Sequence, residues 1–373
     1  MLITQKTTRR RSSGNVAFTV LLAGVLAFAA ACSGERADST TAGAGGGTVR
    51  LLGAGATFPN PLYQKWLSEY SKVNPKAEIN YQSIGSGGGI QQIQSQTIDF
   101  GASDAPMSDE DLKKAPGELL HIPTVLGAVV ITYNLQGIAA PLRFSPDVIA
   151  DIFLGKIKKW NDPRIVADNP GAQLPATDIS VVHRSDGSGT TAVFTDYLAK
   201  VSPEWKTKPG AGKSIDWPVG IGGKGNEGVS GQIKQTPNTI GYVELAYAVQ
   251  TKLPVALIKN KSGNFVAPSL EATTAAAAES LATTPADLRV SITDPAGAEA
   301  YPISSYTYIL VYKDQKDATK GKALVDFLWW GIHEGQQVTK DPQYPYAALP
   351  PQIVEKASTL LNSITSGGKT LRS

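Results

Sequence analysis

The sequence predicts an α/β protein, and three observations lead to this prediction. Short apolar runs alternate with segments of helical periodicity from Thr48 onward, which is the pattern of strands joined by helices in a mostly parallel sheet. Loops of small residues lie next to several of the expected strands, as is typical where strands turn into helices. The composition, 42% hydrophobic and 18% charged, excludes a disordered chain, a coiled coil and a polytopic membrane protein.

The first block of the chain alternates strand and helix. Strands are expected at Thr48–Leu52, Ile79–Ser83 and Ile98–Ala102. Helices are expected over Asn60–Asn74, over Gly88–Thr97 and from Ser108. Asn60 with Pro61 is a typical pair of N-cap and first helical residue, and three acidic residues after Ser108 suit the positive end of a helix dipole.

Two longer apolar strands, Val125–Tyr133 and Tyr306–Tyr312, are expected to bound a second block. Its elements include the segment Pro146–Leu154, strands Ile179–Val182 and Thr239–Val243, and helices Thr190–Lys200 and Glu271–Leu281. Two further helices are expected near Lys322–Gly331 and Pro351–Ile364.

The domain organisation follows from the two long strands. A length of 373 residues suits about two domains. We expect a discontinuous first domain, 48–124 plus 305–373, and an inserted second domain, 125–304, with the two strands crossing between them as a hinge.

The N-terminus predicts export. Residues 1–31 have the pattern of a signal peptide, because a basic region ending at Arg11 precedes an apolar run that ends in small residues. The only cysteine, Cys32, follows directly, and Ala29–Cys32 resembles a bacterial lipobox, in which the cysteine is lipidated. Ordinary cleavage nearby with a spare thiol is the alternative. Residues 32–47 are rich in Gly, Ser, Thr and Ala and are predicted to be a flexible tether.

The charge balance excludes a nucleic-acid partner. Four of the 35 basic residues lie in 1–31, which leaves 31 basic against 32 acidic residues in the rest of the chain. A nearly neutral body lacks the positive surface that nucleic acids require. Any anion that the protein binds must therefore be held by local geometry.

Four small-residue loops are the candidate binding elements: Gly53–Pro59, Ile84–Ile90, Phe100–Met107 and His183–Thr191. A strand-to-helix turn of this kind directs backbone N–H groups and the helix dipole at an anion, and glycine lets the backbone approach closely. One such loop alone is better explained by a capped helix after a tight turn. Four of them would all lie at the carboxyl ends of strands, where open α/β sheets bind ligands.

Two charged residues in these loops have alternative explanations. Arg184 suits a forked contact to an oxyanion, but a solvated arginine paired with Asp186 fits equally well. Asp104 would repel an anion unless the ligand has a proton to donate, as hydrogen phosphate does and sulfate at neutral pH does not; a turn aspartate before Pro106 is the alternative.

Other chemistry is poorly supported. Gly220–Gly225 fits a dinucleotide motif, but Pro218 interrupts the segment before it. The three histidines are scattered and there is no second cysteine, which argues against a metal site. We expect no cofactor, and we expect Trp66, Tyr242 and Trp329 to be core residues rather than ligand-stacking residues.

Six motifs in order resemble the phosphate-binding component of bacterial phosphate ABC importers. They are GAGATFP, FGASDAP, LGKIKKWNDP (Leu154–Pro163), RSDGSGTT, GGKGNEG (Gly222–Gly228) and TIGYVELAYA (Thr239–Ala248). The resemblance runs from Gly53 to about Leu349. It implies a two-domain periplasmic-binding-protein fold of type II, a Venus flytrap with two crossover strands at its hinge, that closes over one phosphate.

The resemblance also implies a set of phosphate contacts: Thr57, the Phe58 amide, Ser86, Asp104, Arg184, Ser188, the Gly189 amide and Thr190. It further implies that Asp104 accepts the phosphate proton, and that Asp186 orients Arg184 and is a second group able to receive a proton. The family usually has a second serine where Gly87 stands and often a basic residue at His183, to which no role is assigned.

The expected function is that of a receptor in the bacterial cell envelope, lipid-anchored, monomeric and not an enzyme. It would deliver phosphate to the permease and ATPase subunits of an ABC importer. The alternatives are a phosphatase or phosphotransferase, with His183 as the only nearby base, a receptor for another oxyanion, and a surface antigen or sensor.

Overall fold

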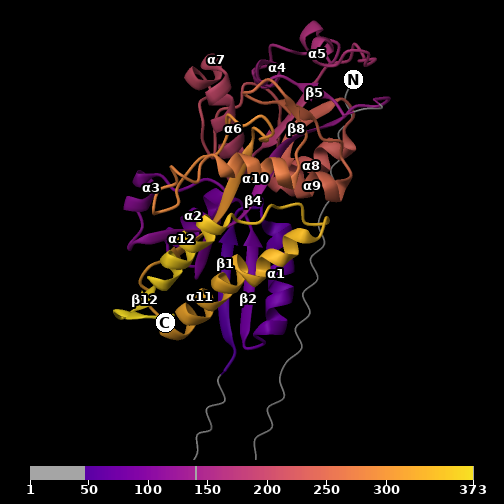
Figure 1. The fold of residues 1–373 in the computed structure, drawn as a ribbon. Helices are drawn as coiled ribbons and strands as arrows, with labels where there is room; N and C mark the ends of the chain where they lie inside the picture. Colours follow the sequence, from indigo (N-terminus) through magenta and orange to yellow (C-terminus); the bar gives the residue numbers. More distant parts are fainter. Residues whose placement is uncertain (1–46, 139–140, 373) are drawn as a thin grey trace, which may run out of the picture. The chain divides into compact units, whose positions relative to one another are not determined.

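The computed structural model describes residues 47–138 and 141–372 (Figure 1). The predicted signal peptide, Cys32 and all of the predicted tether except Gly47 lie outside these residues. Within the described part of the chain, no helix is both long enough and apolar enough to cross a membrane.

A mixed sheet of eight strands organises the fold, in the order β2-β1-β3-β11-β4-β8-β6-β7. Its strands are β1 (Val49–Gly55), β2 (Ala77–Ser83), β3 (Phe100–Ser103), β4 (Leu119–Asn134), β6 (Ser180–Arg184), β7 (Ile221–Gly223), β8 (Thr239–Glu244) and β11 (Ser304–Tyr312). Smaller sheets contain β5 (Arg143–Phe144), β9 (Leu257–Lys259) and β10 (Phe265–Val266), and β12 (Thr365–Ser366) and β13 (Lys369–Thr370).

The expectation of mostly parallel strands is right for the two ends of the sheet and wrong for its middle. Strands β2, β1 and β3 are mutually parallel, and so are β8, β6 and β7. The three central pairs, β3 with β11, β11 with β4 and β4 with β8, are antiparallel. The chain leaves the first strand group through β4 and returns through β11, so these two neighbours must run in opposite directions.

Strand β4 connects the two ends of the sheet. It pairs with β11 over Leu119–Ala128 and with β8 over Val129–Asn134. It begins six residues before the predicted strand. The sequence did not indicate this early part because His121 and Pro123 interrupt the apolar pattern there. His121 fits the core because its Nε2 atom accepts a hydrogen bond from the Met107 N–H at 3.0 Å, and burial lowers its pKa to about 3, which keeps the ring neutral.

The helices of the described residues pack against both ends of the sheet (Figure 1). They are α1 (Asn60–Val73), α2 (Ser86–Gln94), α3 (Asp109–Lys113), α4 (Pro146–Phe153), α5 (Pro163–Asp168), α6 (Gly189–Val201), α7 (Pro203–Thr207), α8 (Gly225–Gln235), α9 (Leu245–Thr251), α10 (Leu270–Ala278), α11 (Ala318–Ile332) and α12 (Pro351–Asn362), with a 3-10 turn at Glu334–Lys340. Helices α1, α2 and α11 contact the β2-β1-β3 group. Helix α8 contacts β8, β6, β7 and β4, and α6 contacts β8 and β4.

Two predicted helix starts differ from the structure. The N-cap of α1 is Pro59, and the Asn60 side chain accepts a hydrogen bond from Gln64 Nε2 at 3.0 Å instead of capping the helix. Helix α2 begins at Ser86, two residues before the predicted start, because its first turn is built from small loop residues that carry no apolar periodicity. The predicted start at Ser108 is confirmed, since its hydroxyl oxygen accepts from the Asp111 N–H at 3.1 Å.

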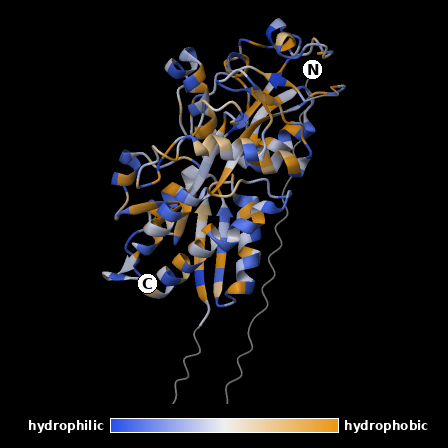
Figure 2. Ribbon diagram, in the orientation of Figure 1, coloured by the Kyte–Doolittle hydropathy of each residue, from blue (hydrophilic) through white to orange (hydrophobic). Residues whose placement is uncertain are grey.

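The core follows the central strands, where hydrophobic residues are frequent (Figure 2). Trp66 and Tyr242 are fully buried, as expected, and the Trp66 indole N–H donates to the Gly335 carbonyl at 2.9 Å. Trp329 is only partly buried: the His333 ring stacks on it, and the Arg372 guanidinium lies 3.8 Å from its ring centre. Trp66 and Tyr242 are therefore core residues as predicted, whereas Trp329 packs at the edge of the core.

Candidate functional site

The four candidate loops lie where the sequence predicts them, at the carboxyl ends of β1, β2, β3 and β6. Three of the loops lead into helices, α1, α2 and α6, whose first-turn backbone N–H groups have no acceptor within the helix itself. Strand β4 pairs with β11 through its first part and with β8 through its second part, and the two strand groups run in opposite directions. The carboxyl ends of β1, β2 and β3 therefore face that of β6, and the loops bring residues far apart in sequence into direct contact. We call the resulting set of buried side chains the polar cluster: Thr57, Ser86, Asp104, Arg184, Thr190, Asn226 and Thr307.

Arg184 and Asp186 form the charged pair of this region. Arg184 Nε lies 2.7 Å from Asp186 Oδ1, and Nη2 lies 2.6 Å from Oδ2, so the contact is a two-point fork. The Arg184 side chain is 1% exposed and that of Asp186 is 14% exposed. Burial alone would raise the pKa of Asp186, but hydrogen bonding and charge attraction from Arg184, aided by the Gly225 N–H, lower it.

Asp104 has a different environment. Its Oδ1 atom accepts from the Thr307 hydroxyl at 2.8 Å, and Oδ2 lies 3.4 Å from Ser86 Oγ. No cation forms an ion pair with Asp104 within the described residues. Burial therefore raises its pKa to about 7, although Thr307, the charge of Arg184 and Ser86 each act to lower it.

Gly189 makes the close approach of two loops possible. Its N–H, at the start of α6, donates to Ser86 Oγ at 3.0 Å. A Cβ atom at this position would collide with Asp104 Oδ2 and Ser86 Oγ, so only glycine fits. The first turn of α6 thus faces the Asp104 carboxyl directly.

The other predicted contact residues lie beside the cluster. Ser188 is buried, and its Oγ atom caps α6 by accepting from the Thr191 N–H at 3.0 Å. Phe58 is fully buried, and its carbonyl accepts from the Tyr346 hydroxyl at 2.7 Å. Its ring therefore belongs to the core, and only its backbone is available for a ligand contact.

Sequence reasoning missed two members of the cluster, Asn226 and Thr307. Asn226 bonds to the hydroxyl oxygens of both Thr57 and Thr190. It directly follows the glycine motif Gly220–Gly225, which fits a dinucleotide-binding turn. A glycine-rich loop before a helix was the feature of the sequence that could have indicated a site residue here. Thr307 lies inside strand β11 between two large tyrosines, and nothing in this sequence pattern indicated that it would contact Asp104.

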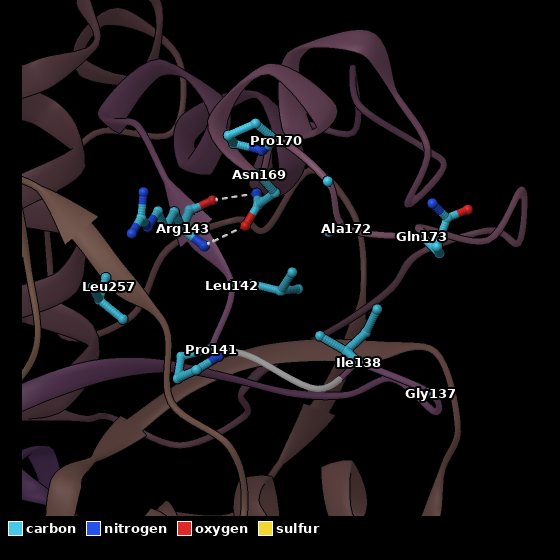
Figure 3. Close-up of a pocket in the computed structure, with 11 residues that line it drawn as sticks. Gly137, Ile138, Pro141, Leu142, Arg143, Asn169, Pro170, Ala172, Gln173 and Leu257 are labelled. Carbon is cyan, nitrogen blue, oxygen red and sulfur yellow. Dashed lines mark hydrogen bonds between the residues drawn. The ribbon is translucent and has the colours of Figure 1, made fainter.

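Two surface hollows adjoin the polar cluster, and a larger one does not. One of about 240 Å³ is bordered by Asp104, and one of about 400 Å³ by Arg184 and Asp186, so both adjoin the cluster. A third, of about 660 Å³, is bordered by Arg143 and Asn169 (Figure 3). The Asn169 amide accepts a hydrogen bond from the Arg143 backbone N–H and donates one to the Arg143 carbonyl, at 2.8 Å each. None of the predicted contact residues lines this pocket.

The cluster is suited to holding an anion by hydrogen bonds. Hydroxyls, backbone N–H groups and one guanidinium supply donors, while the nearby formal charges are one positive and two negative. His183 Nδ1 lies 2.9 Å from the Arg184 carbonyl oxygen, and its ring stacks on Trp217. Among the described residues it makes no hydrogen bond to Ser188 or Thr190, and no group of three His, Cys, Asp or Glu side chains could hold a metal ion.

Comparison with known proteins places the chain in a family. A model of the PBP superfamily domain matches residues 40–329. The phosphate-binding protein PstS of Xylella fastidiosa strain 9a5c is 46% identical over 310 residues, covering 83% of this chain and 84% of that protein. The phosphate-binding protein PstS of Pasteurella multocida is 47% identical over 324 residues, covering 86% and 93%.

Solved structures show the same fold at low identity. The phosphate-binding protein of Stenotrophomonas maltophilia matches with a TM-score of 0.64 and 20% identity, covering 84% of this chain and 94% of that one. A putative phosphate ABC transporter substrate-binding protein of Clostridium perfringens, solved with bound phosphate, matches with a TM-score of 0.60 and 16% identity, covering 81% and 100%. The predicted two-domain periplasmic-binding fold with crossover strands is thereby confirmed, and the chain belongs to the PBP superfamily and, within it, to the family of PstS phosphate-binding proteins.

Proposed function

We propose that this protein is an extracytoplasmic receptor that binds inorganic phosphate at the polar cluster and delivers it to an ABC permease. One observation carries the proposal: Asp104 is a buried carboxyl that has no ion-pair partner among the described residues and lies next to hydroxyl and backbone N–H donors. A carboxylate at such a position is useful only if the ligand brings a proton to it. Hydrogen phosphate has that proton and a full set of acceptor oxygens.

The remaining contacts follow from the donors around Asp104. Asp186 holds Arg184 in place through Nε and Nη2, and the remaining N–H groups of the guanidinium supply charged donors. Ser86, Ser188, Thr57 and Thr190 supply hydroxyls, and the Phe58 and Gly189 amides supply N–H groups. Because the two carboxylates outweigh the one guanidinium, binding depends on many dipoles rather than on net positive charge.

Selectivity against sulfate follows from the same carboxyl. At a pH above its pKa of about 7, Asp104 is ionised and would face a fully ionised sulfate oxygen with no proton between them. A site whose buried polar groups match one ligand in this way discriminates by roughly 10⁴–10⁵-fold.

Delivery requires a change of shape and a position near the membrane. We propose that the domains 48–124 plus 305–373 and 125–304 close over the anion around β4 and β11, and that only the closed form docks on the permease. Lipidation of Cys32 and the tether 32–47 would keep a monomeric receptor close to the permease and its ATPase.

A titration panel tests the function. Calorimetry with the purified mature chain should give tight binding of phosphate and arsenate and none of sulfate or a phosphate monoester at pH 8. Binding of sulfate as tight as that of phosphate would contradict the proposal. Turnover of a chromogenic phosphate ester by the same protein would instead support the enzymatic alternative.

A further inference from the structure

Asn226, at the start of α8, occupies the space between two hydroxyls that are proposed phosphate contacts. Its Nδ2 atom lies 2.7 Å from Thr57 Oγ1 and 3.0 Å from Thr190 Oγ1. Its side chain is completely buried, and an amide –NH₂ group has two hydrogens, one for each of these oxygens.

The orientation of this amide is set by the backbone of β8. The Glu244 N–H lies 3.0 Å from Asn226 Oδ1, and a backbone N–H can only donate. The oxygen of the amide must therefore face Glu244, and the –NH₂ group must face the two threonines. The alternative flip would place two donors against each other.

Thr57 has no remaining choice of hydrogen-bond direction. Its Oγ1 atom accepts from the Asn226 backbone N–H at 3.2 Å as well as from Nδ2. A hydroxyl has two lone pairs and one proton, so both lone pairs are used. Neither nitrogen can accept, and the hydroxyl proton must point away from Asn226.

Thr190 is constrained in the same way. Its Oγ1 atom faces Asn226 Nδ2 at 3.0 Å and Arg184 Nη1 at 3.5 Å, and both nitrogens are donors only. The Thr190 hydroxyl proton is therefore also free to turn toward a bound anion.

We propose that Asn226 is a positioning residue: it occupies the acceptor lone pairs of Thr57 and Thr190 and thereby makes both hydroxyls donors to the anion. The inference rests on the proposed function and adds to it a cause for the donor character of the site. Without Asn226, each hydroxyl could rotate its proton toward another acceptor and offer a lone pair to the anion, which repels it.

A double-mutant cycle on Asn226 and Thr190 tests the proposal. The two residues lie on α6 and α8, which both contact β4 and β8. Their contact therefore does not depend on the proposed closure of the two domains, unlike the contact of Asn226 with Thr57. Phosphate affinity is measured by calorimetry for wild type, Asn226→Ala, Thr190→Val and the double variant. Each single substitution should weaken binding about tenfold, as expected for a hydrogen bond to a charged group.

The double variant distinguishes the two accounts. If Asn226 acts by orienting Thr190, the loss in the double variant should be at least about threefold smaller than the product of the single losses. Losses that simply multiply would overturn the proposal. Absence of phosphate binding by wild type would overturn the proposed function itself.

Matched controls separate positioning from folding. Asn169→Ala removes a buried asparagine whose amide is also fully hydrogen-bonded, to Arg143 (Figure 3) and Ile165 and to none of the proposed contacts, and should leave the phosphate affinity within about twofold. If Asn226→Ala does not fold, the same cycle is run with Asn226→Ser, whose side chain is too short to reach both threonines. The same rule of interpretation then applies.

Discussion

Two carboxyls, Asp186 and Asp104, lie in the candidate site and behave in opposite ways. Asp186 meets Arg184 in a two-point fork, and this contact lowers its pKa. Asp104 is more deeply buried and receives only the hydroxyls of Thr307 and Ser86 as donors, and burial raises its pKa to about 7. The difference shows how one fold keeps one carboxylate permanently charged to hold an arginine and leaves the other free to exchange a proton near neutral pH.

The largest expected effect comes from removing Arg184, the ion-pair partner of Asp186. Arg184→Met takes away the charged fork and leaves Asp186 buried without its partner. We expect phosphate affinity to fall by at least about 100-fold, since truncating one member of a buried charge pair in a binding site costs about 2–5 kcal/mol. Calorimetric titration measures the loss.

Arg164→Met is the matched control for this substitution. Arg164 also bonds to aspartates, but its side chain is 44% exposed and it lies away from the cluster. Exposed pairs contribute about 0–1 kcal/mol, so phosphate affinity should stay unchanged. A loss smaller than tenfold for Arg184→Met would show that the fork is not part of the binding site.

The raised pKa of Asp104, the carboxyl without an ion pair among the described residues, predicts a pH dependence of the free energy of unfolding. A carboxyl whose pKa is about 7 when folded and about 3.9 when unfolded binds its proton more tightly in the folded chain. Its contribution therefore falls as pH rises from about 4 to about 7 and is constant above that range. Asp104→Asn removes the dependence, so the ligand-free variant should gain roughly 2 kcal/mol over wild type between pH 5 and pH 8.

Urea unfolding of both ligand-free proteins at the two pH values measures this gain. Comparing the variant with wild type cancels the titration of all other groups that the substitution leaves unchanged. An equal difference between the two proteins at pH 5 and at pH 8 would show that Asp104 titrates normally.

A smaller effect is expected from the donor that orients Asp104. Thr307→Val removes the 2.8 Å hydrogen bond to Oδ1, which acts to lower the carboxyl pKa, so that pKa should rise further. Phosphate affinity should fall about threefold to tenfold, as expected for one hydrogen bond to a charged group. Calorimetry measures the change.

Thr132→Val provides the comparison. Thr132 is a buried threonine on β4 that also donates one hydrogen bond at 2.8 Å, to the Pro254 carbonyl, and it is outside the cluster. Its loss should lower stability without affecting affinity. Equal affinity losses for both variants would mean that Thr307 acts only through the fold.

The sequence was most informative where a residue type has one dominant use. The glycine-rich loops and the Arg184 motif predicted which strand ends meet, because small residues at a strand-to-helix turn have few other purposes. The central antiparallel pairs were missed because an apolar strand carries no information about its direction. Asn226 and Thr307 were missed because their importance comes from neighbours more than 30 residues away, which only the folded chain brings together.

The assignment of each phosphate contact and the domain boundaries remain predictions of the sequence and its family resemblance. They are consistent with the burial of the cluster. The experiments on Arg184 and Asp104 test two of these contacts directly.

The most direct test of the account is the ratio of phosphate to sulfate affinity in wild type and in Asp104→Asn, measured by calorimetry at pH 8. Wild type should prefer phosphate by at least about 10⁴-fold. In the variant the amide no longer carries the negative charge that rejects sulfate, and the ratio should fall by at least about 100-fold. An unchanged ratio would show that Asp104 does not recognise the proton of the ligand.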